Sequence, residues 1–245
     1  RPQRPQGANG QRRQSGLQRI GALGLAFQHF VGRVPEGLRH FGVLQTGGRG
    51  RRGRRWSSPV GNLYCSTILR PDCTAAQAAE IGFVAALAVA DLVPQGRAIR
   101  VKWPNDVLVD GGKVAGILPE SSVRQDGKVD YVVLGIGVNV SFAPQLPEMR
   151  YPGATLGGTV EAAAEGLTLA LARWLDEWRR GGFATIRAGW LAKAGPLGST
   201  VDVKLGDELV SGRFAGMDEG GALLLETLAG PRRIVSGELL GRAAC

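Results

Sequence analysis

The stretch IRVKWPNDVLVDGGKVAGIL at residues 99–118 sets much of the expected fold. Two apolar, β-branched runs, Val107–Val109 and Lys113–Leu118, flank the tight turn Asp110-Gly111-Gly112. An Asp-Gly turn between such runs is a strong hairpin signal, because both residues tolerate the positive φ angles that the turn requires. Ile99–Trp103 predicts another strand, which a proline ends because it has no N–H to donate.

Segments on both sides extend this hairpin into a larger fold. Further strands are expected over Phe41–Gln45, Asn62–Leu69 and Val129–Val140. Helices are expected over Thr74–Val93, about 160–180 and about 183–194. The first of these is alanine-rich with apolar residues at helical spacing, and Asp72 or Thr74 is suited to cap it. The predicted class is α+β, with a mainly antiparallel sheet covered by helices.

Composition divides the chain into three parts. Residues 1–42 are predicted to be an atypical, disordered N-terminal segment, because its Arg-, Gln- and Gly-rich start lacks the apolar periodicity of a packed element. Residues 43–195 form the main domain, which ends at a Gly-Pro boundary. Residues 198–245 are expected to form a small β-barrel, with turns at Gly206-Asp207 and Glu219-Gly220-Gly221.

Charge and composition narrow the functional classes. The net charge is +9, but residues 1–55 hold 12 of the 30 basic residues and one acidic residue. This concentration argues against specific nucleic-acid binding by the whole protein, while a basic nucleic-acid-binding module on residues 1–55 stays open as an alternative. The last histidine is His40, which argues against a Ser–His–Asp triad or a His-ligated zinc site in the body. Three cysteines without CxxC spacing favour a reducing, cytoplasmic location, and we expect no membrane association.

Residues 45–56 read QTGGRGRRGRRW and form the first candidate site. Arginine presents a fork of donors to phosphate or carboxylate oxygens, and interleaved glycines let the backbone wrap an anion. This is not a Walker A loop, because Gly53 is followed by Arg54 and not by Lys-Ser or Lys-Thr. A flexible basic tract that binds nucleic acid through its charge is the other interpretation, and the loop alone leaves both open.

Three further motifs follow, each with an ordinary structural interpretation when taken alone. They are Lys102-Trp103-Pro104-Asn105-Asp106, Lys113-Val114-Ala115-Gly116-Ile117-Leu118-Pro119-Glu120 and Gly135-Ile136-Gly137-Val138-Asn139-Val140. The first is typical of a turn, and its Asn–Asp pair can contact a base, a ribose or a metal-bound phosphate. In the second, Lys113 either is solvated at a hairpin edge or points into a pocket, where its charge has a larger effect. The glycines of the third indicate a close approach to the strand backbone, without the GxGxxG pattern of a dinucleotide fold.

Taken together and in this order, the four motifs resemble the catalytic domain of biotin–protein ligases. The resemblance runs from about Val43 to Val140 and continues more loosely to the end, where the Gly206-Asp207 turn and residues 221–226 are similar to that family's small C-terminal barrel. It implies a class II synthetase-like biotin/lipoate ligase fold with an SH3-like C-terminal β-barrel and no N-terminal DNA-binding domain. It also implies ATP-dependent ligation of biotin, through biotinyl-5′-adenylate, to a lysine of a biotin carboxyl carrier protein. The implied substrates are biotin and ATP, with Mg²⁺.

The resemblance further implies residue roles. Lys113 matches a lysine that touches the biotin carboxylate and the α-phosphate, and with Arg51 it is expected to be catalytic. Trp56 matches a residue that packs on the adenine. Asp106 and Asn139 match residues around the nucleotide and its magnesium. The full set of expected binding residues is Gln45, Thr46, Gly48, Arg49, Gly50, Arg51, Arg54, Trp56, Asn105, Asp106, Lys113, Gly116, Gly137 and Asn139.

The implied partner is the biotin carboxyl carrier domain of acetyl-CoA carboxylase or of another biotin-dependent carboxylase, and a homodimer is allowed. A lipoate or octanoate ligase or transferase of the same fold is an alternative, although the arginine-rich loop followed by Trp56 favours biotin. The resembled family carries a Ser-Thr-Asn motif before the Gln-Thr loop, and residues 1–40 contain none. We therefore interpret these residues as lying outside the fold, for which a translation-frame error would be one origin.

Overall fold

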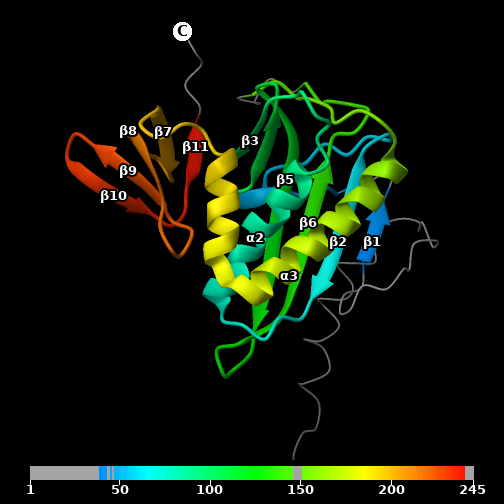
Figure 1. The fold of residues 1–245 in the computed structure, drawn as a ribbon, viewed down its shortest axis with the longest axis horizontal. Coiled ribbons are helices and arrows are strands. Elements are labelled where there is room, and N and C mark those ends of the chain that lie inside the picture. The colour runs from blue at the N-terminus through cyan, green and yellow to red at the C-terminus, as the bar shows by residue number, and fades with distance from the viewer. Residues whose placement is uncertain (1–38, 43–44, 46, 146–150, 241–245) are drawn as a thin grey trace, which may run out of the picture.

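A six-stranded antiparallel sheet, in the order β1-β2-β6-β5-β4-β3, forms the main domain. The computed structural model describes residues 39–42, 45, 47–145 and 151–240, without the side chains of residues 39–42. The strands are β1 (Arg39–Gly42), β2 (Leu63–Leu69), β3 (Ile99–Lys102), β4 (Asp106–Val109), β5 (Gly112–Val123) and β6 (Val129–Val138). Helices α2 (Ala75–Ala90) and α3 (Val160–Lys193) cover one face of this sheet (Figure 1). The predicted α+β class is confirmed.

The β4–β5 hairpin forms where the sequence predicts it. Asp110 and Gly111 have φ angles of 51° and 80°, the left-handed pair that a two-residue hairpin turn requires. β5 is longer than expected, because it continues through Pro119 to Val123. β4 pairs with β5 only as far as Gly116, so the missing N–H of Pro119 leaves no bond to β4 unmade.

The edge strand β1 begins before the predicted domain boundary at residue 43. It covers Arg39–Gly42, whereas a strand was expected over Phe41–Gln45, and it pairs antiparallel with β2 from Arg39–Thr67 to Gly42–Tyr64. Backbone hydrogen bonds to β2 thus hold the last residues of the segment predicted to be disordered. Residues 1–38 lie outside the described part of the chain.

Helix α2 is alanine-rich because it lies between the sheet and α3. Thr74 caps it as expected: its side chain accepts from the Gln77 N–H, and the Gln77 side chain accepts from the Thr74 N–H. Most of the helix is buried, including Ala85, Ala86 and Ala88. Small side chains let two layers approach this helix closely without leaving voids.

Helix α3 is bent at Gly182, whose φ of 65° and ψ of −166° interrupt the helical backbone. The prediction of two helices that meet near residue 182 is therefore confirmed. The first half buries an apolar stripe, formed by Leu167, Leu171, Leu175 and Trp178, against the main domain. Among the described residues, none of the helices has the length and apolar character needed to cross a membrane.

A second, five-stranded sheet in the order β10-β9-β8-β7-β11 forms the small C-terminal domain. Its strands are β7 (Thr200–Leu205), β8 (Glu208–Met217), β9 (Leu223–Thr227), β10 (Gly230–Ile234) and β11 (Glu238–Leu240). The two predicted turns connect β7 to β8 and β8 to β9, in line with the expected small SH3-like domain. In Figure 1 this sheet lies beside β3 and the C-terminal half of α3.

The two domains share one hydrophobic core. The Trp103 side chain is 2% exposed, and its Nε1 donates to the carbonyl oxygen of Gly221 at 3.0 Å, in the turn between β8 and β9. Gly221 in turn packs against Phe83 of α2 and Phe183 of α3, whose rings lie 5.5 Å apart. The Lys-Trp-Pro-Asn-Asp turn is therefore anchored to the C-terminal domain through its tryptophan.

Replacing Trp103 with Phe is expected to lower the free energy of unfolding by about 1–3 kcal/mol, because the buried Gly221 carbonyl loses its donor. Urea denaturation measures this. Trp174→Phe is the matched control, since Trp174 Nε1 donates to Asp91 at the surface and water can replace it. Equal losses in the two variants would contradict the interdomain role of Trp103.

Candidate functional site

Two glycines form a flat floor on the sheet face that the helices leave uncovered. Gly116 of β5 and Gly137 of β6 are direct cross-strand partners. Pro119, three residues after Gly116 and so on the opposite face, contacts Gly82 of α2. The Trp56 indole lies on the glycine pair: a methyl carbon added at Gly137 would be 2.6 Å from Trp56 Nε1, and one at Gly116 would be 2.9 Å from the ring. Any side chain on this floor would displace the indole.

The Trp56 indole brings an aromatic surface next to a cation. The Lys113 Nζ lies 5.3 Å from the centre of the Trp56 ring. The Trp56 Nε1 is buried and has no hydrogen-bond partner among the described residues.

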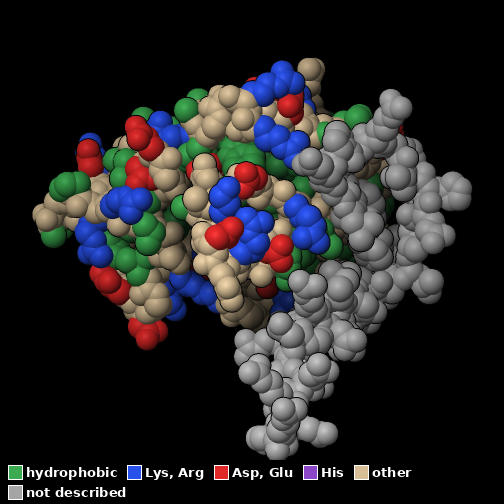
Figure 2. Space-filling view, turned by 90° about the horizontal axis from the view of Figure 1, so that it is seen from below, with side chains coloured by type: hydrophobic (Ala, Val, Ile, Leu, Met, Phe, Trp, Pro, Cys, Tyr) green, Lys and Arg blue, Asp and Glu red, His purple; other side chains and the backbone are tan. Residues whose placement is uncertain are grey.

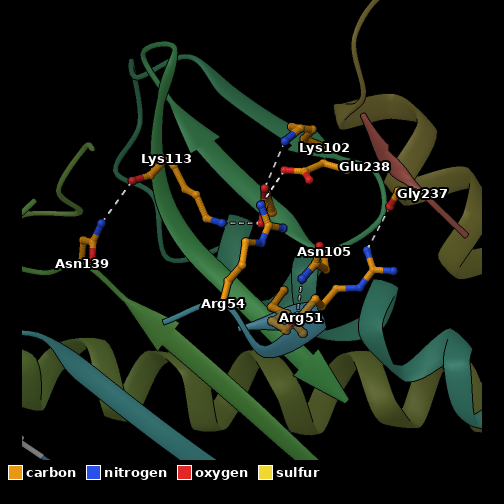
Figure 3. Close-up of polar contacts among 10 residues, drawn as sticks. Arg51, Arg54, Lys102, Asn105, Lys113, Asn139, Gly237 and Glu238 are labelled. Atoms are coloured by element: carbon orange, nitrogen blue, oxygen red, sulfur yellow. Dashed lines mark hydrogen bonds and ion pairs between the residues drawn. The ribbon is translucent and has the colours of Figure 1, made fainter. Parts of the chain in front are cut away.

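A buried cluster of three charges stands beside the floor. Asp106 Oδ1 lies 2.7 Å from Lys113 Nζ, and Asp106 Oδ2 lies 3.1 Å from Lys102 Nζ. The exposed fractions of the side chains are 15% for Asp106, 23% for Lys113 and 6% for Lys102. Figure 3 shows both lysines reaching toward the same region from β5 and β3. Burial alone would raise the pKa of Asp106, but the ammonium groups of Lys113 and Lys102 outweigh it and hold that pKa below its usual value.

The arginine-rich loop of residues 45–56 folds over this cluster and reaches the C-terminal domain. Its short 3₁₀ turn η1 (Arg51–Gly53) is closed by the bond from the Arg54 N–H to the Arg51 carbonyl at 3.3 Å, and the Gly50 N–H donates across the turn to the Arg54 carbonyl at 2.7 Å. Arg54 pairs with Glu238 of β11 at 2.7 Å, and Arg51 donates to the Gly237 carbonyl at 3.3 Å (Figure 3). Burial, together with the charge of Arg52, lowers the pKa of Arg51. In Figure 2 basic and acidic side chains are intermixed over the described surface of the face shown.

The start of the loop is packed more tightly than its middle. Gln45 Oε1 lies 3.1 Å from the hydroxyl of Ser58, and a methyl carbon added at Gly48 would be 2.5 Å from that hydroxyl oxygen. Glycine at position 48 is therefore required by close packing. Arg49 forms only a 3.8 Å ion pair with Glu120, more than half exposed on both sides. Thr46 lies outside the described residues.

The asparagines of the predicted site hold the backbone around it. Asn105 Nδ2 donates to the Ile117 carbonyl at 2.7 Å, which ties its turn to β5. Asn139, 2% exposed, donates to the Lys113 carbonyl at 3.2 Å and accepts from Asn62 at 3.4 Å. Asn62 accepts in addition from the N–H groups of residues 140, 141 and 142.

Asp106 and Asn139 do not fit the magnesium site that the resemblance implies. Both oxygens of Asp106 are paired with ammonium groups, and the Asn139 amide is buried with both of its ends bonded. Mg²⁺ needs carboxylate or water oxygens that are open to it. Among the described residues, no group of three or more His, Cys, Asp or Glu side chains is placed to hold a metal ion.

Sequence reasoning missed the burial of Lys102 and the central position of Asn62. Lys102 precedes a buried tryptophan and alternates like a strand residue, so its pattern is that of an ordinary edge lysine. Its spacing of four residues from Asp106 across a Pro-Asn turn is the available signal. Asn62 and Glu238 contact the site only through tertiary structure, which local spacing does not encode.

The sequence is similar to two protein-family descriptions and to known ligases. Residues 22–139 match the family described as "Biotin/lipoate A/B protein ligase family", and residues 197–239 match the "Biotin protein ligase C terminal domain". A biotin--[acetyl-CoA-carboxylase] ligase of Paracoccus denitrificans is 42% identical over 210 residues, which is 80% of this chain and 86% of that protein. A bifunctional ligase/repressor of Bacillus subtilis is 32% identical over 217 residues, 84% of this chain and 66% of that protein.

A solved structure of a biotin protein ligase has a similar fold. The biotin protein ligase of Aquifex aeolicus, in complex with biotin and ATP, superimposes with a TM-score of 0.70 at 28% identity, covering 85% of this chain and 90% of that one. The chain belongs to the biotin/lipoate A/B protein ligase family. Within it, the match to the C-terminal domain and the relatives place the chain among the biotin protein ligases, so it is a ligase. The alternative of a lipoate or octanoate enzyme is not favoured.

Replacing Gly137 with Ala is expected to push the Trp56 indole off the floor, because the new methyl group would lie 2.6 Å from Nε1. Acrylamide quenching of tryptophan fluorescence should rise, and the rise should vanish in a Trp56→Phe background. Gly135→Ala is the matched control, since its methyl carbon would meet nothing closer than the Leu118 carbonyl oxygen at 3.4 Å. Unchanged quenching in Gly137→Ala would contradict this placement of Trp56.

Proposed function

We propose that this chain activates biotin with ATP and transfers it to a lysine of a biotin carboxyl carrier domain of acetyl-CoA carboxylase or a related carboxylase. The relatives' activity supports the overall reaction. The observation that carries the assignment to these residues is the Lys113 ammonium, held 2.7 Å from Asp106 beside the Trp56 indole on a glycine floor. A cation beside a flat aromatic surface suits a carboxylate or phosphate group that lies next to a nucleotide base.

The reaction has two balanced steps. The biotin carboxylate attacks the α-phosphorus of ATP, which forms biotinyl-5′-adenylate and releases pyrophosphate. The uncharged lysine amine of the carrier then attacks the acyl carbon, forming an amide and releasing AMP and a proton. The first step brings two anions together, so a cation between them lowers the barrier by relieving their repulsion.

Lys113 and Arg51 are the proposed catalytic residues for the first step. The Lys113 backbone is fixed by its N–H bond to Pro152 at 2.8 Å and by its carbonyl, which accepts from Ala154 at 2.9 Å. Rotation of the side chain alone can therefore move the ammonium group toward a substrate. Arg51 adds a third cation near Asp106, besides the ammonium groups of Lys113 and Lys102, and its guanidinium fork suits phosphate oxygens. Positioning both reactants supplies much of the remaining acceleration.

The other loop residues are proposed to close over the adenylate. Gln45 and Gly48–Gly50 would line the biotin side, and Arg54 would exchange Glu238 for a phosphate oxygen. Trp56 would pack on the adenine, while Gly116 and Gly137 leave the room that its indole needs on the sheet. Asn105 and Asn139 would shape the nucleotide side by holding β5 and β6. Among the described residues, no group of three or more carboxylates is placed to bind Mg²⁺, and both oxygens of Asp106 are paired, so we assign the ion no protein ligand and no role in either step.

A carrier-biotinylation assay tests the proposed reaction. Purified protein is mixed with biotin, Mg-ATP and a biotin carrier domain, and the carrier's mass is followed. A mass increase equal to biotin minus water is expected, and no increase with lipoate or octanoate in its place. Transfer of lipoate in preference to biotin would instead support the lipoate alternative. A homodimer, a cytoplasmic location and the absence of specific nucleic-acid binding stay predictions.

Lys113→Ala is expected to slow adenylate formation by about 10²–10³, the usual cost of removing one well-placed charged donor. Pyrophosphate release measures the rate. Folding should survive, because this lysine lies outside the apolar core. Lys113→Arg should rescue only in part, since a broad planar fork cannot replace a compact ammonium. A folded Lys113→Ala variant that forms adenylate at the normal rate would refute the role of Lys113.

A further inference from the structure

The buried cluster beside the floor has one more positive charge than its carboxylate can neutralise. Asp106 contacts two ammonium groups, Lys102 at 3.1 Å and Lys113 at 2.7 Å. One lysine would suffice to pair a buried carboxylate. The second lysine therefore leaves these three side chains with a net charge of +1, in a position largely removed from water, and the nearby Arg51 adds to that positive charge.

The two lysines differ in what they can reach. Lys102 is 6% exposed, and its Nζ lies 4.6 Å from the centre of the Tyr151 ring, so it is enclosed by protein. Lys113 is 23% exposed, and its Nζ lies 5.3 Å from the Trp56 ring, so it faces the floor. Of the two lysines, Lys113 is the one placed to meet a ligand that lies against the Trp56 indole.

We propose that Lys102 is a positioning residue that neutralises Asp106 and so leaves the charge of Lys113 for the substrate carboxylate. This inference rests on the proposed contact between Lys113 and biotin. When that carboxylate arrives, Lys113 turns from Asp106 to it, and Lys102 keeps the buried Asp106 paired. Asp106 in turn holds Lys113 beside the floor before the substrate binds. This assignment replaces the magnesium-ligand role expected for Asp106.

Two variants should affect biotin affinity differently: Lys102→Met should weaken binding, and the added Asp106→Asn change should restore it. In Lys102→Met, Lys113 becomes the only lysine paired with the buried Asp106, and an arriving carboxylate would place two anions on one ammonium. Biotin affinity should fall about 10-fold to 100-fold, the usual effect of an unfavourable buried charge balance. In the double variant Lys102→Met/Asp106→Asn, the buried anion is gone and Lys113 is released. Affinity should return to within about threefold of the unmodified protein, within the normal scatter of such couplings.

The experiment is a calorimetric titration of the full chain with biotin, without ATP or Mg²⁺. Lys128→Met is the matched control, because Lys128 also pairs with an aspartate, Asp72 at 2.8 Å, but half exposed and remote in sequence from the cluster. It should bind biotin normally. Thermal melts establish that each variant is folded. If Lys102→Met does not fold, the single variant Asp106→Asn provides the test. Its biotin affinity should equal or exceed that of the unmodified protein. A tenfold loss of affinity would overturn the proposal.

Biotin binding by Lys113→Ala and by Lys102→Met distinguishes the role of Lys113 from that of Lys102. If the unmodified protein does not bind biotin, or if Lys113→Ala binds it normally, the proposed function of Lys113 fails and the inference with it. If Lys113→Ala weakens binding but Lys102→Met does not, the function stands and the inference is wrong. A double variant that stays as weak as Lys102→Met also overturns it. In Asp106→Asn the adenylation rate should fall about tenfold with an unchanged half-saturating Mg²⁺ concentration; a shift of that concentration would favour the magnesium-ligand role.

Discussion

The pairing of Gly116 with Gly137 is the constraint on which the site depends. Antiparallel register places the two glycines directly opposite each other, on the face that the helices leave open. With no side chain at either position, the Trp56 indole can lie on the backbone of β5 and β6. A slip by one residue would bring Ile117 and Ile136 to that face and fill the space. The turn that joins β5 to β6, closed by the Arg124 N–H bond to the Lys128 carbonyl at 2.8 Å, therefore matters for function because it contributes to this register.

Strands β3, β4 and β5 arrange the charges around that floor. Asp106 begins β4 and is the register partner of Gly116, so its carboxylate arrives at the edge of the floor. Lys102 ends β3, and Lys113 follows the hairpin turn. The arrangement converts three residues from one hairpin and its neighbour into a preformed cationic site. The loop arginines add charge from a separate segment and are held by β11 of the C-terminal domain.

Much of the fold could be predicted from the sequence, because the deciding signals are local. The Asp110-Gly111 turn, the Thr74 cap and the break near Gly182 each follow from backbone preferences of a few residues. The start of β1 and the extension of β5 past Pro119 were missed, since both depend on which neighbouring strand is present. At the site, the motifs identified Lys113 and Trp56, but the pairing of Asp106 with two lysines is a tertiary property. Resemblance therefore suggested a metal ligand where the geometry gives an ion cluster.

The bend at Gly182 lets one helix belong to both domains. The first half of α3 lies on the main sheet, and the second half donates from Arg187 to the Met217 carbonyl of β8 at 2.7 Å. Phe183 and Trp190, on the second half, both pack near Phe83 of α2. Because the shared helix must melt for either part to open, the two sheets should behave as one cooperative unit in calorimetry and exchange their most protected amide hydrogens together.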